Sequence, residues 1–106
     1  MWKRIIQSFT ENPRDIKTNP LTRKTPLWFY AYVENGKLFV DRAKTNTPSS
    51  NLSKRRLVSA DEKTCNAMYD IYLRRKRGES VSAEACATTV NQVYWYGIFA
   101  DLENKD

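Results

Sequence analysis

The hydrophobic pattern is clearest in residues 27–41, where two short apolar runs flank a turn signal. Residues 27–33 read Leu-Trp-Phe-Tyr-Ala-Tyr-Val and residues 37–41 read Lys-Leu-Phe-Val-Asp, and both runs are rich in strand formers. The Asn35-Gly36 pair between them suits a two-residue turn that needs positive φ at both positions, so the pattern predicts a β-hairpin. Because the first run is apolar throughout, we expect one face on the core and the other covered by a helix or a partner.

A helical pattern follows over residues 60–77. Ser59 and Glu62 have the spacing of a capping box, and Gly78 stands where a helix commonly stops. The apolar positions that share one face are Cys65, Met68, Ile71 and Tyr72. Acidic residues in the first turn and basic residues in the last turn suit the helix dipole. These signals predict a helix over residues 60–77.

The C-terminal third predicts two more helices. Ser82 precedes a run of small residues, which indicates a short helix over residues 82–88. Residues 90–103 have a helical stripe of apolar positions, yet their aromatic residues are equally good strand formers. Length favours a helix there, because a strand of this length would be unusual. Gly97 in its middle would allow another backbone to approach closely.

The N-terminal quarter has weaker signals. Apolar residues fall on one helical face of residues 2–9, enough for one or two turns that must dock on something to be ordered. Residues 10–26 contain three prolines among polar residues and are expected to be irregular. We therefore predict a small α+β domain over residues 27–106, with the hairpin packed on two or three helices. Residues 1–26 are expected to be an N-terminal extension.

Charge is unevenly distributed along the 106 residues, whose net charge is +6. Residues 1–60 hold twelve Lys and Arg against four Asp and Glu. Two basic clusters flank the helix predicted at 60–77: residues 54–56 precede it, and the four consecutive cations of residues 74–77 lie at its end. A long polar loop over residues 43–58 contains the first cluster. Four consecutive cations exceed what one helix end uses for its dipole, so the clusters indicate a surface for a polyanion. The residues expected to contact phosphates are Lys44, Lys54, Arg55, Arg56, Arg74, Arg75, Lys76 and Arg77.

Residue types exclude several kinds of chemistry. The chain has no histidine, and Cys65 and Cys86 do not form a C-x-x-C pair, so the sequence predicts neither a zinc site nor another cofactor. Both cysteines fall in apolar helical patterns and are expected to be reduced and buried, as in a cytoplasmic protein. No run of about 18 apolar residues is present, so neither a membrane span nor a signal peptide is expected.

The acid–lysine group that comes nearest to a nuclease site is Glu34, Asp41 and Lys44. In a strand, the spacing of Asp41 and Lys44 places these two side chains on opposite faces, so they cannot share a metal-dependent phosphodiester site. The three glycines are isolated, which gives no phosphate-binding loop. We therefore expect no enzymatic activity and no small-molecule ligand.

Residues 78–96 resemble the helix-turn-helix pattern of small DNA-binding domains. The matching positions are the small residue Ala85, the apolar residue Val90 after a turn, and the polar residue Asn91. The resemblance implies that Asn91 and Gln92 enter the major groove and read adenine edges. The same residues also fit a plain helical hairpin in the core.

The sequence thus predicts a basic protein that binds nucleic acid, with DNA favoured over RNA. The hairpin rings Trp28, Tyr30, Tyr32 and Phe39 are either core side chains or surfaces on which unpaired bases stack. The alternative function is a protein-interaction module, such as a regulator or antidefence factor of a mobile element. Such a module would act through an aromatic C-terminal surface at residues 94–99. A homodimer, with acidic C-terminal residues against the basic first half of a second copy, stays open.

Overall fold

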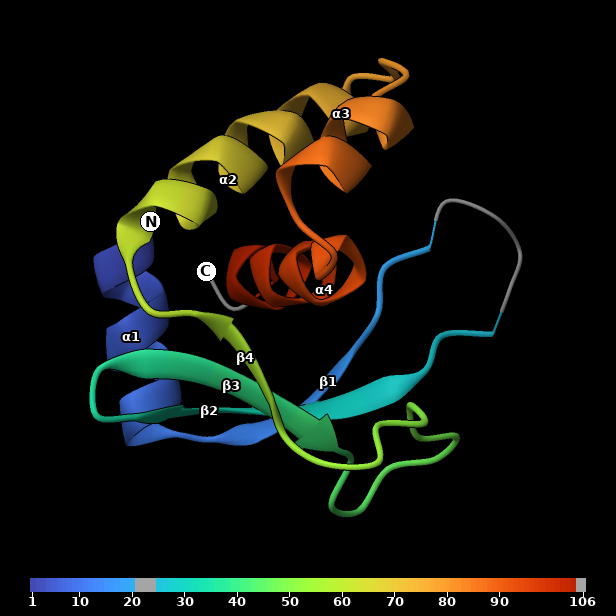
Figure 1. Cartoon of the computed structure of the whole chain (residues 1–106). Coiled ribbons are helices and arrows are strands. Elements are labelled where there is room, and N and C mark those ends of the chain that lie inside the picture. The colour runs from blue at the N-terminus through green and yellow to red at the C-terminus, as the bar shows by residue number, and fades with distance from the viewer. Residues whose placement is uncertain (21–24, 105–106) are drawn as a thin grey trace.

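The protein is an α+β domain in which a four-stranded antiparallel sheet is covered by helices (Figure 1). The computed structural model describes residues 1–20 and 25–104. The elements in chain order are α1 (Trp2–Glu11), β1 (Arg14–Lys17), β2 (Trp28–Glu34), β3 (Lys37–Arg42), β4 (Arg56–Ser59), α2 (Glu62–Lys76), α3 (Ser82–Thr88) and α4 (Gln92–Glu103). The predicted α+β fold class is confirmed, and so are the hairpin and the three C-terminal helices.

The sheet is a simple meander in the order β1-β2-β3-β4. The predicted hairpin forms its centre, and its turn has the expected backbone, with φ of 53° at Asn35 and 73° at Gly36. A turn with positive φ at both residues matches the twist of the two strands and fixes their register. Tyr30 therefore lies opposite Asp41, and Tyr32 lies opposite Phe39.

The two edge strands were not predicted. The prediction of an irregular segment over residues 10–26 is wrong for Arg14–Lys17, which pairs with β2 as β1. The prediction of a loop over residues 43–58 is wrong for its last residues, because Arg56–Ser59 pairs with β3 as β4. Both strands are only four residues long, and β1 has a single apolar residue, so they acquire strand structure from their neighbours rather than from a pattern of their own.

Helix α2 has the predicted buried face but a different start. Its N-cap is Asp61, whose carboxylate accepts a hydrogen bond from the Lys63 N–H at 3.0 Å. Ser59 ends β4 instead, and its hydroxyl donates to the Asp61 carbonyl oxygen at 2.7 Å. The capping box predicted from Ser59 is therefore absent, because that residue belongs to the sheet. Gly78 ends the helix as predicted, with φ of 92°.

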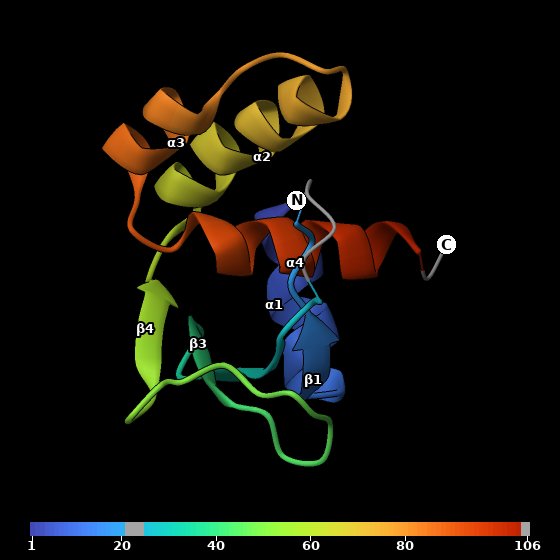
Figure 2. The same cartoon turned by 90° about the vertical axis from the view of Figure 1, so that its right-hand side faces the viewer.

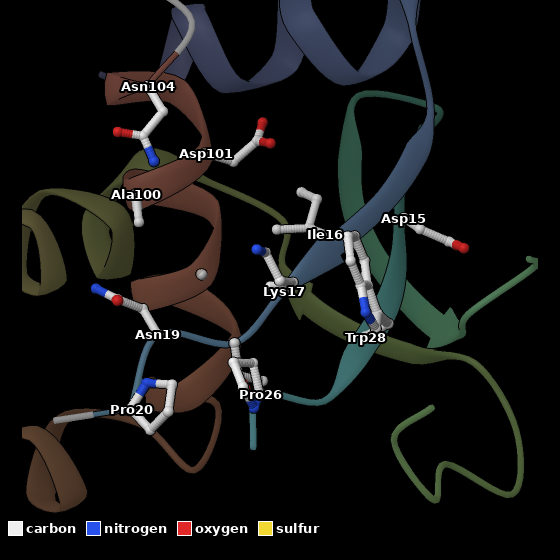
Figure 3. A pocket seen from close by; sticks show the side chains of 12 residues that line it. Asp15, Ile16, Lys17, Asn19, Pro20, Pro26, Trp28, Ala100, Asp101 and Asn104 are labelled. Carbon is white, nitrogen blue, oxygen red and sulfur yellow. The ribbon is translucent and has the colours of Figure 1, made fainter. Parts of the chain in front are cut away.

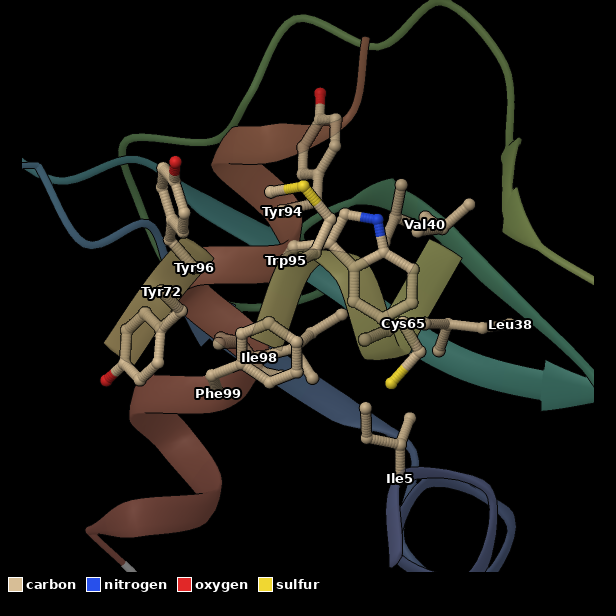
Figure 4. Close-up of a cluster of buried hydrophobic side chains, with 14 of the residues drawn as sticks. Ile5, Leu38, Val40, Cys65, Tyr72, Tyr94, Trp95, Tyr96, Ile98 and Phe99 are labelled. Atoms are coloured by element: carbon tan, nitrogen blue, oxygen red, sulfur yellow. The ribbon is translucent and has the colours of Figure 1, made fainter. Parts of the chain in front are cut away.

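Helix α4 is the central element of the fold. It lies between the sheet on one side and the α2–α3 pair on the other (Figure 2). Its buried residues include Trp95, Ile98 and Phe99, which join side chains from the sheet and from α2 in one core (Figure 4). A Cβ at Gly97 would lie 2.6 Å from the Lys17 carbonyl oxygen, so this glycine permits the close approach of α4 to β1 that the sequence indicated.

Helix α1 closes one end of this core. It is longer than predicted, and Ile5 and Phe9 on its apolar face are fully buried. Ile16 of β1 is also part of the core. The segment expected to be an extension, residues 1–26, thus supplies three buried core side chains within its described part.

Candidate nucleic-acid interface

The two faces of the sheet carry different side chains. The face toward α4 is apolar and buried, with Phe29, Ala31, Leu38 and Val40 at 0% exposure. The opposite face, which we call the outer face, has none of α2, α3 and α4 against it (Figure 1). Strand alternation places every second side chain of β2 and β3, and one of β4, on it, including Glu34 and Lys37 at the hairpin turn and six further side chains. These six are Trp28, Tyr30, Tyr32, Phe39, Asp41 and Leu57.

The aromatic rings of the outer face form a row of contacts. The Tyr30 and Tyr32 ring centroids are 5.7 Å apart, and those of Tyr32 and Phe39 are 5.6 Å apart in a stacked arrangement. All three rings are half-buried, and Leu57 beyond Phe39 is 46% exposed. Trp28 lies at the other end of β2. The hairpin rings are therefore surface side chains packed on one another, which answers the question that the sequence left open.

Exposed cations lie on these rings. The Lys44 Nζ is 5.0 Å from the Tyr30 centroid, the Arg55 guanidinium is 4.4 Å from that of Phe39, and the Lys17 Nζ is 5.6 Å from that of Trp28. Cations over ring faces are attracted by the ring quadrupole while their charge stays accessible to solvent. The outer face is therefore both aromatic and positively charged.

The backbone that carries Lys44 is held by one carboxylate of β1. Asp15 accepts hydrogen bonds from the N–H groups of Lys44, Thr45 and Asn46 at 2.8, 2.9 and 2.9 Å, and from the Thr45 hydroxyl at 3.1 Å. Burial acts to raise the pKa of Asp15, but these donors outweigh it and hold the pKa below its ordinary value. The loop after β3 is thus fixed against β1 by an ionised side chain.

Arg55 is oriented by two neighbours on the hairpin. It donates to the Tyr32 hydroxyl at 3.3 Å and forms an ion pair with Glu34. The hydrogen bond to Tyr32 and the pairing with Glu34 raise the pKa of Arg55 above its ordinary value. The side chains of the pair are still 50% and 47% exposed, so the guanidinium remains open to a further ligand.

The basic cluster of residues 54–56 is divided by strand alternation. Arg55 lies over the outer face, whereas Arg56 lies over the Tyr94 ring of α4, 5.9 Å from its centroid. Lys54 is exposed in the turn before them. Of the three predicted phosphate contacts here, Arg55 is the one that joins the aromatic row.

The Arg74–Arg77 run does not form a free patch. Three of its four residues form ion pairs within the protein. Arg74 pairs with Asp70 at 3.0 Å and with Glu84. Lys76 pairs with Glu103 at 2.9 Å, and Arg77 pairs with Glu79 at 3.1 Å. The hydrogen bond from Arg74 lowers the pKa of Glu84. Most of the positive charge predicted to face a phosphate backbone is therefore matched within the protein.

Arg75, the remaining member of this run, points inward. Its guanidinium donates to the Asn19 carbonyl oxygen at 2.7 Å and lies 4.2 Å from the Tyr96 ring centroid. Burial lowers the pKa of Arg75 below its ordinary value. This arginine fastens the segment at Asn19 to α2 and α4.

The geometry of α3 and α4 differs from the predicted helix-turn-helix roles. Ala85 is buried as expected, but the expected apolar plug, Val90, is 80% exposed. Asn91 is 7% exposed and accepts a 3.4 Å hydrogen bond from Arg56, and Gln92 is half-buried beside Cys86. A recognition helix needs an open polar face for the groove, whereas most of α4 is buried in the core and the exposed side chain in its first turn is the apolar Val93. The base-reading roles predicted for Asn91 and Gln92 are inconsistent with this placement.

The predicted aromatic C-terminal surface is also absent from the structure. The rings of α4 are buried within the chain's own core, with Trp95 and Phe99 at 0% exposure and Tyr94 at 8%. The cysteines differ from each other: Cys65 is buried as predicted, whereas Cys86 is exposed, contrary to prediction, and both are free. Cys86 lies on the solvent side of α3, a helix too short for its apolar face to be read from the sequence.

A cleft of about 480 Å³ lies between β1 and α4 (Figure 3). Lys17, Asn19 and Pro26 line one side of it, and Gly97 and Asp101 line the other. Its carboxylate is already engaged, because Asp101 accepts a 2.6 Å ion-pair hydrogen bond from Arg14. Asp15 also borders the cleft but points away from it, toward the loop that it holds. Trp28 lines the cleft and also lies on the outer face, so the two are adjacent.

The acid–lysine group considered for a nuclease does not form one cluster. Lys44 and Asp41 do lie beside Tyr30 on the same face, contrary to the prediction from their spacing, because β3 ends at Arg42 and strand alternation does not extend to Lys44. Glu34 pairs with Arg55, Lys44 lies on Tyr30, and Asp41 accepts a hydrogen bond from the Arg42 N–H. Within residues 1–20 and 25–104, no group of three or more acidic or cysteine side chains is placed to hold a metal ion. No helix in the described part of the chain is long and apolar enough to cross a membrane.

Sequence reasoning missed three members of the outer face: Asp15, Lys17 and Leu57. All three are on edge strands that were not predicted. The sequence has no local signal for them, because their place on this face follows from pairing with the hairpin: Asp15 lies opposite Tyr30, and Leu57 lies opposite Phe39. The chain matches no protein-family model, no curated protein and no solved structure.

Proposed function

We propose that the protein binds single-stranded nucleic acid on the outer face of its sheet. The observation that carries the proposal is the row of half-buried rings with exposed cations lying on it. Proteins that bind single strands combine aromatic side chains, on which bases stack, with positive charges that follow the phosphate backbone. Unpaired nucleotides have both a flat apolar surface and a negative charge, and they suit this face on both counts.

An unpaired strand fits the outer face better than a duplex does. The bases of a duplex are stacked inside it, and their faces are not available to Tyr30, Tyr32 or Phe39. Duplex reading by direct contact uses a helix or a ribbon that enters the major groove. The outer face instead presents the broad side of a sheet, and the helix predicted to read bases, α4, is internal.

Rings and cations have separate roles in this proposal. Tyr30, Tyr32 and Phe39 stack on bases, a contact that tolerates any sequence because every base has a π-face. Lys44 and Arg55 neutralise phosphates, and each phosphate contact adds to the dependence of affinity on salt. Stacking acts equally on DNA and RNA, and DNA, favoured by the sequence, is the first ligand to test.

The test is fluorescence anisotropy with a labelled mixed-sequence DNA strand of about 12 nucleotides, a length within the site sizes of single-strand-binding folds. The same sequence as RNA and as a DNA duplex is titrated in parallel, each at two salt concentrations. We expect single strands to bind more tightly than the duplex, with affinity that falls as salt rises. Binding to none of the three at low salt would contradict the proposal and point to a protein partner for the outer face.

A variant pair separates binding from stability. Tyr32→Ala removes the ring between Tyr30 and Phe39 and should weaken binding of the single strand. Tyr69→Ala is the matched control, because Tyr69 is a half-buried ring on α2 that contacts Phe99 of the core at 5.1 Å. The control should lower thermal stability and leave affinity unchanged. Equal losses of affinity in both variants would place the binding surface elsewhere.

A further inference from the structure

Two carboxylates flank Tyr30 on the outer face. Strand register places Asp15 of β1 opposite Tyr30 on one side and Asp41 of β3 opposite it on the other. A negative charge beside a ring proposed to stack on a base is unexpected if the face holds only a phosphate backbone, because it repels phosphate. The two carboxylates therefore need separate explanations.

Asp15 is explained by the fold, and Asp41 is not. The carboxylate of Asp15 accepts four hydrogen bonds from residues 44–46. Asp41 accepts one, from the Arg42 N–H to its Oδ1 at 2.7 Å, and its Oδ2 takes part in no hydrogen bond or ion pair with the described residues. An ionised carboxylate has about four acceptor positions. Asp41 thus presents unused acceptor capacity directly beside Tyr30.

Building on the proposed function, we propose that Asp41 and Tyr30 form a subsite that selects guanine within a single strand. In this subsite, a base stacked on Tyr30 would turn its hydrogen-bonding edge toward β3, where Asp41 lies opposite Tyr30. A carboxylate only accepts hydrogen bonds, so it favours a base that presents adjacent donors. Guanine presents two adjacent donors, N1–H and the N2 amino group, which match the two oxygens of one carboxylate in charge-assisted hydrogen bonds.

The other bases match Asp41 less well. Adenine and cytosine offer one amino group next to an acceptor nitrogen, and thymine and uracil offer one N–H between two carbonyl oxygens, which repel a carboxylate. Lys44 lies over Tyr30 in the unliganded protein, and only its side chain has to move, because its backbone is held by Asp15. The displaced ammonium group is then available to the phosphate of the bound nucleotide.

The test compares labelled oligothymidine strands that differ at one central position. The centre is guanine, inosine, adenine, cytosine or thymine, and inosine is guanine without its N2 amino group. A single guanine avoids four-stranded structures. We expect the guanine strand to bind roughly tenfold more tightly than the all-thymine strand, a ratio within the range of one bidentate base contact. Inosine should lose most of this preference.

Two variants assign the preference to its residue. Asp41→Asn removes the charge and replaces one acceptor by a donor, so the guanine preference should disappear while affinity for oligothymidine stays the same or rises. Asp61→Asn is the matched control: it removes one negative charge at the start of α2, where asparagine caps a helix equally well. This control should keep the preference. Circular dichroism melting of both variants verifies that they are folded.

The outcomes separate the two proposals. If no strand binds, the proposed function fails and the guanine subsite fails with it. If strands bind without a guanine preference, or if the preference survives in Asp41→Asn, the subsite is wrong while single-strand binding stands. If inosine binds as well as guanine, the two-donor contact is wrong.

Discussion

The cations on the outer face and those at the end of α2 resemble each other in sequence and differ in what they contact. Lys44 and Arg55 lie on aromatic rings and are exposed to solvent. The members of the Arg74–Arg77 run instead meet carboxylates or a backbone carbonyl of their own chain. The contrast is sharpest for Lys44, which lies on Tyr30 and forms no ion pair with a described residue, so its charge stays available to a ligand. Arg55 shares a carboxylate partner, Glu34, with the α2 cations, but it differs from them in its place on the aromatic row. The density of basic residues in the sequence therefore does not by itself identify a binding surface, because the fold decides what each cation lies beside.

The comparison is tested most strongly by removing two rings together. The double variant Tyr30→Ala/Tyr32→Ala should weaken single-strand binding by roughly 2–6 kcal/mol, because each stacked base contributes about 1–3 kcal/mol. The measurement is anisotropy with the 12-nucleotide strand, after a circular dichroism spectrum has verified the fold. Because these two rings lie outside the core, the double variant should stay folded. A folded double variant that still binds at wild-type affinity would refute the assignment of the outer face.

The second prediction concerns the end of α2. Arg75→Ala removes the hydrogen bond to the Asn19 carbonyl and the contact with the Tyr96 ring, and it should lower the free energy of unfolding by about 1–2 kcal/mol. Affinity for the single strand and its salt dependence should stay unchanged. Urea unfolding and anisotropy measure the two effects. A weakened affinity with normal stability would make Arg75 a ligand contact and reverse the comparison.

Acid should loosen the outer face through Asp15. Because its pKa is lower in the folded protein than its ordinary value of 3.8, Asp15 stabilises the fold above that value. This contribution is lost as the pH falls through the folded-state pKa. We therefore expect the unfolding free energy of the wild type to fall below about pH 4 more steeply than that of Asp15→Asn. Urea unfolding at neutral pH and at several acidic pH values gives both curves; parallel curves would show that Asp15 does not hold the loop.

The smallest expected effect is that of a single exposed cation. Lys44→Ala should leave stability unchanged and reduce the slope of log affinity against log salt by about 0.7, the value for one phosphate of a single strand. Lys3→Ala is its matched control, because Lys3 is equally exposed but lies on α1. An unchanged slope in Lys44→Ala, or the same reduction in both variants, would remove Lys44 from the phosphate path.

The parts of the fold with local signals were predictable. The Asn35-Gly36 turn, the apolar face of α2 and the stop at Gly78 each depend on residues close together in sequence. The strands β1 and β4 depend instead on β2 and β3, because four residues are too few to carry a strand pattern of their own. The N-cap of α2 shifted to Asp61 for the same reason, because pairing with β3 extends the strand through Ser59.

The candidate site was predictable only in part. Stacking by the hairpin rings was one of two readings, and the choice required knowing that α4 covers the other face of the sheet. The fate of the basic clusters depended on distant residues. Glu84 and Glu103, which pair with Arg74 and Lys76, lie on other helices. Sequence proximity reveals where charges concentrate, but a fold decides which of them are neutralised.

The unequal burial of the two cysteines gives this protein a ready attachment point for a probe. Burial raises the pKa of Cys65 to about 11, so its thiol is both inaccessible and protonated near neutral pH. Cys86 is exposed on α3, in the helical layer separated from the sheet by α4. A maleimide dye would thus attach at one position of the unmodified chain, remote from Tyr30 and Asp41. Energy transfer from that dye to a labelled strand would report where the strand lies without any engineered residue.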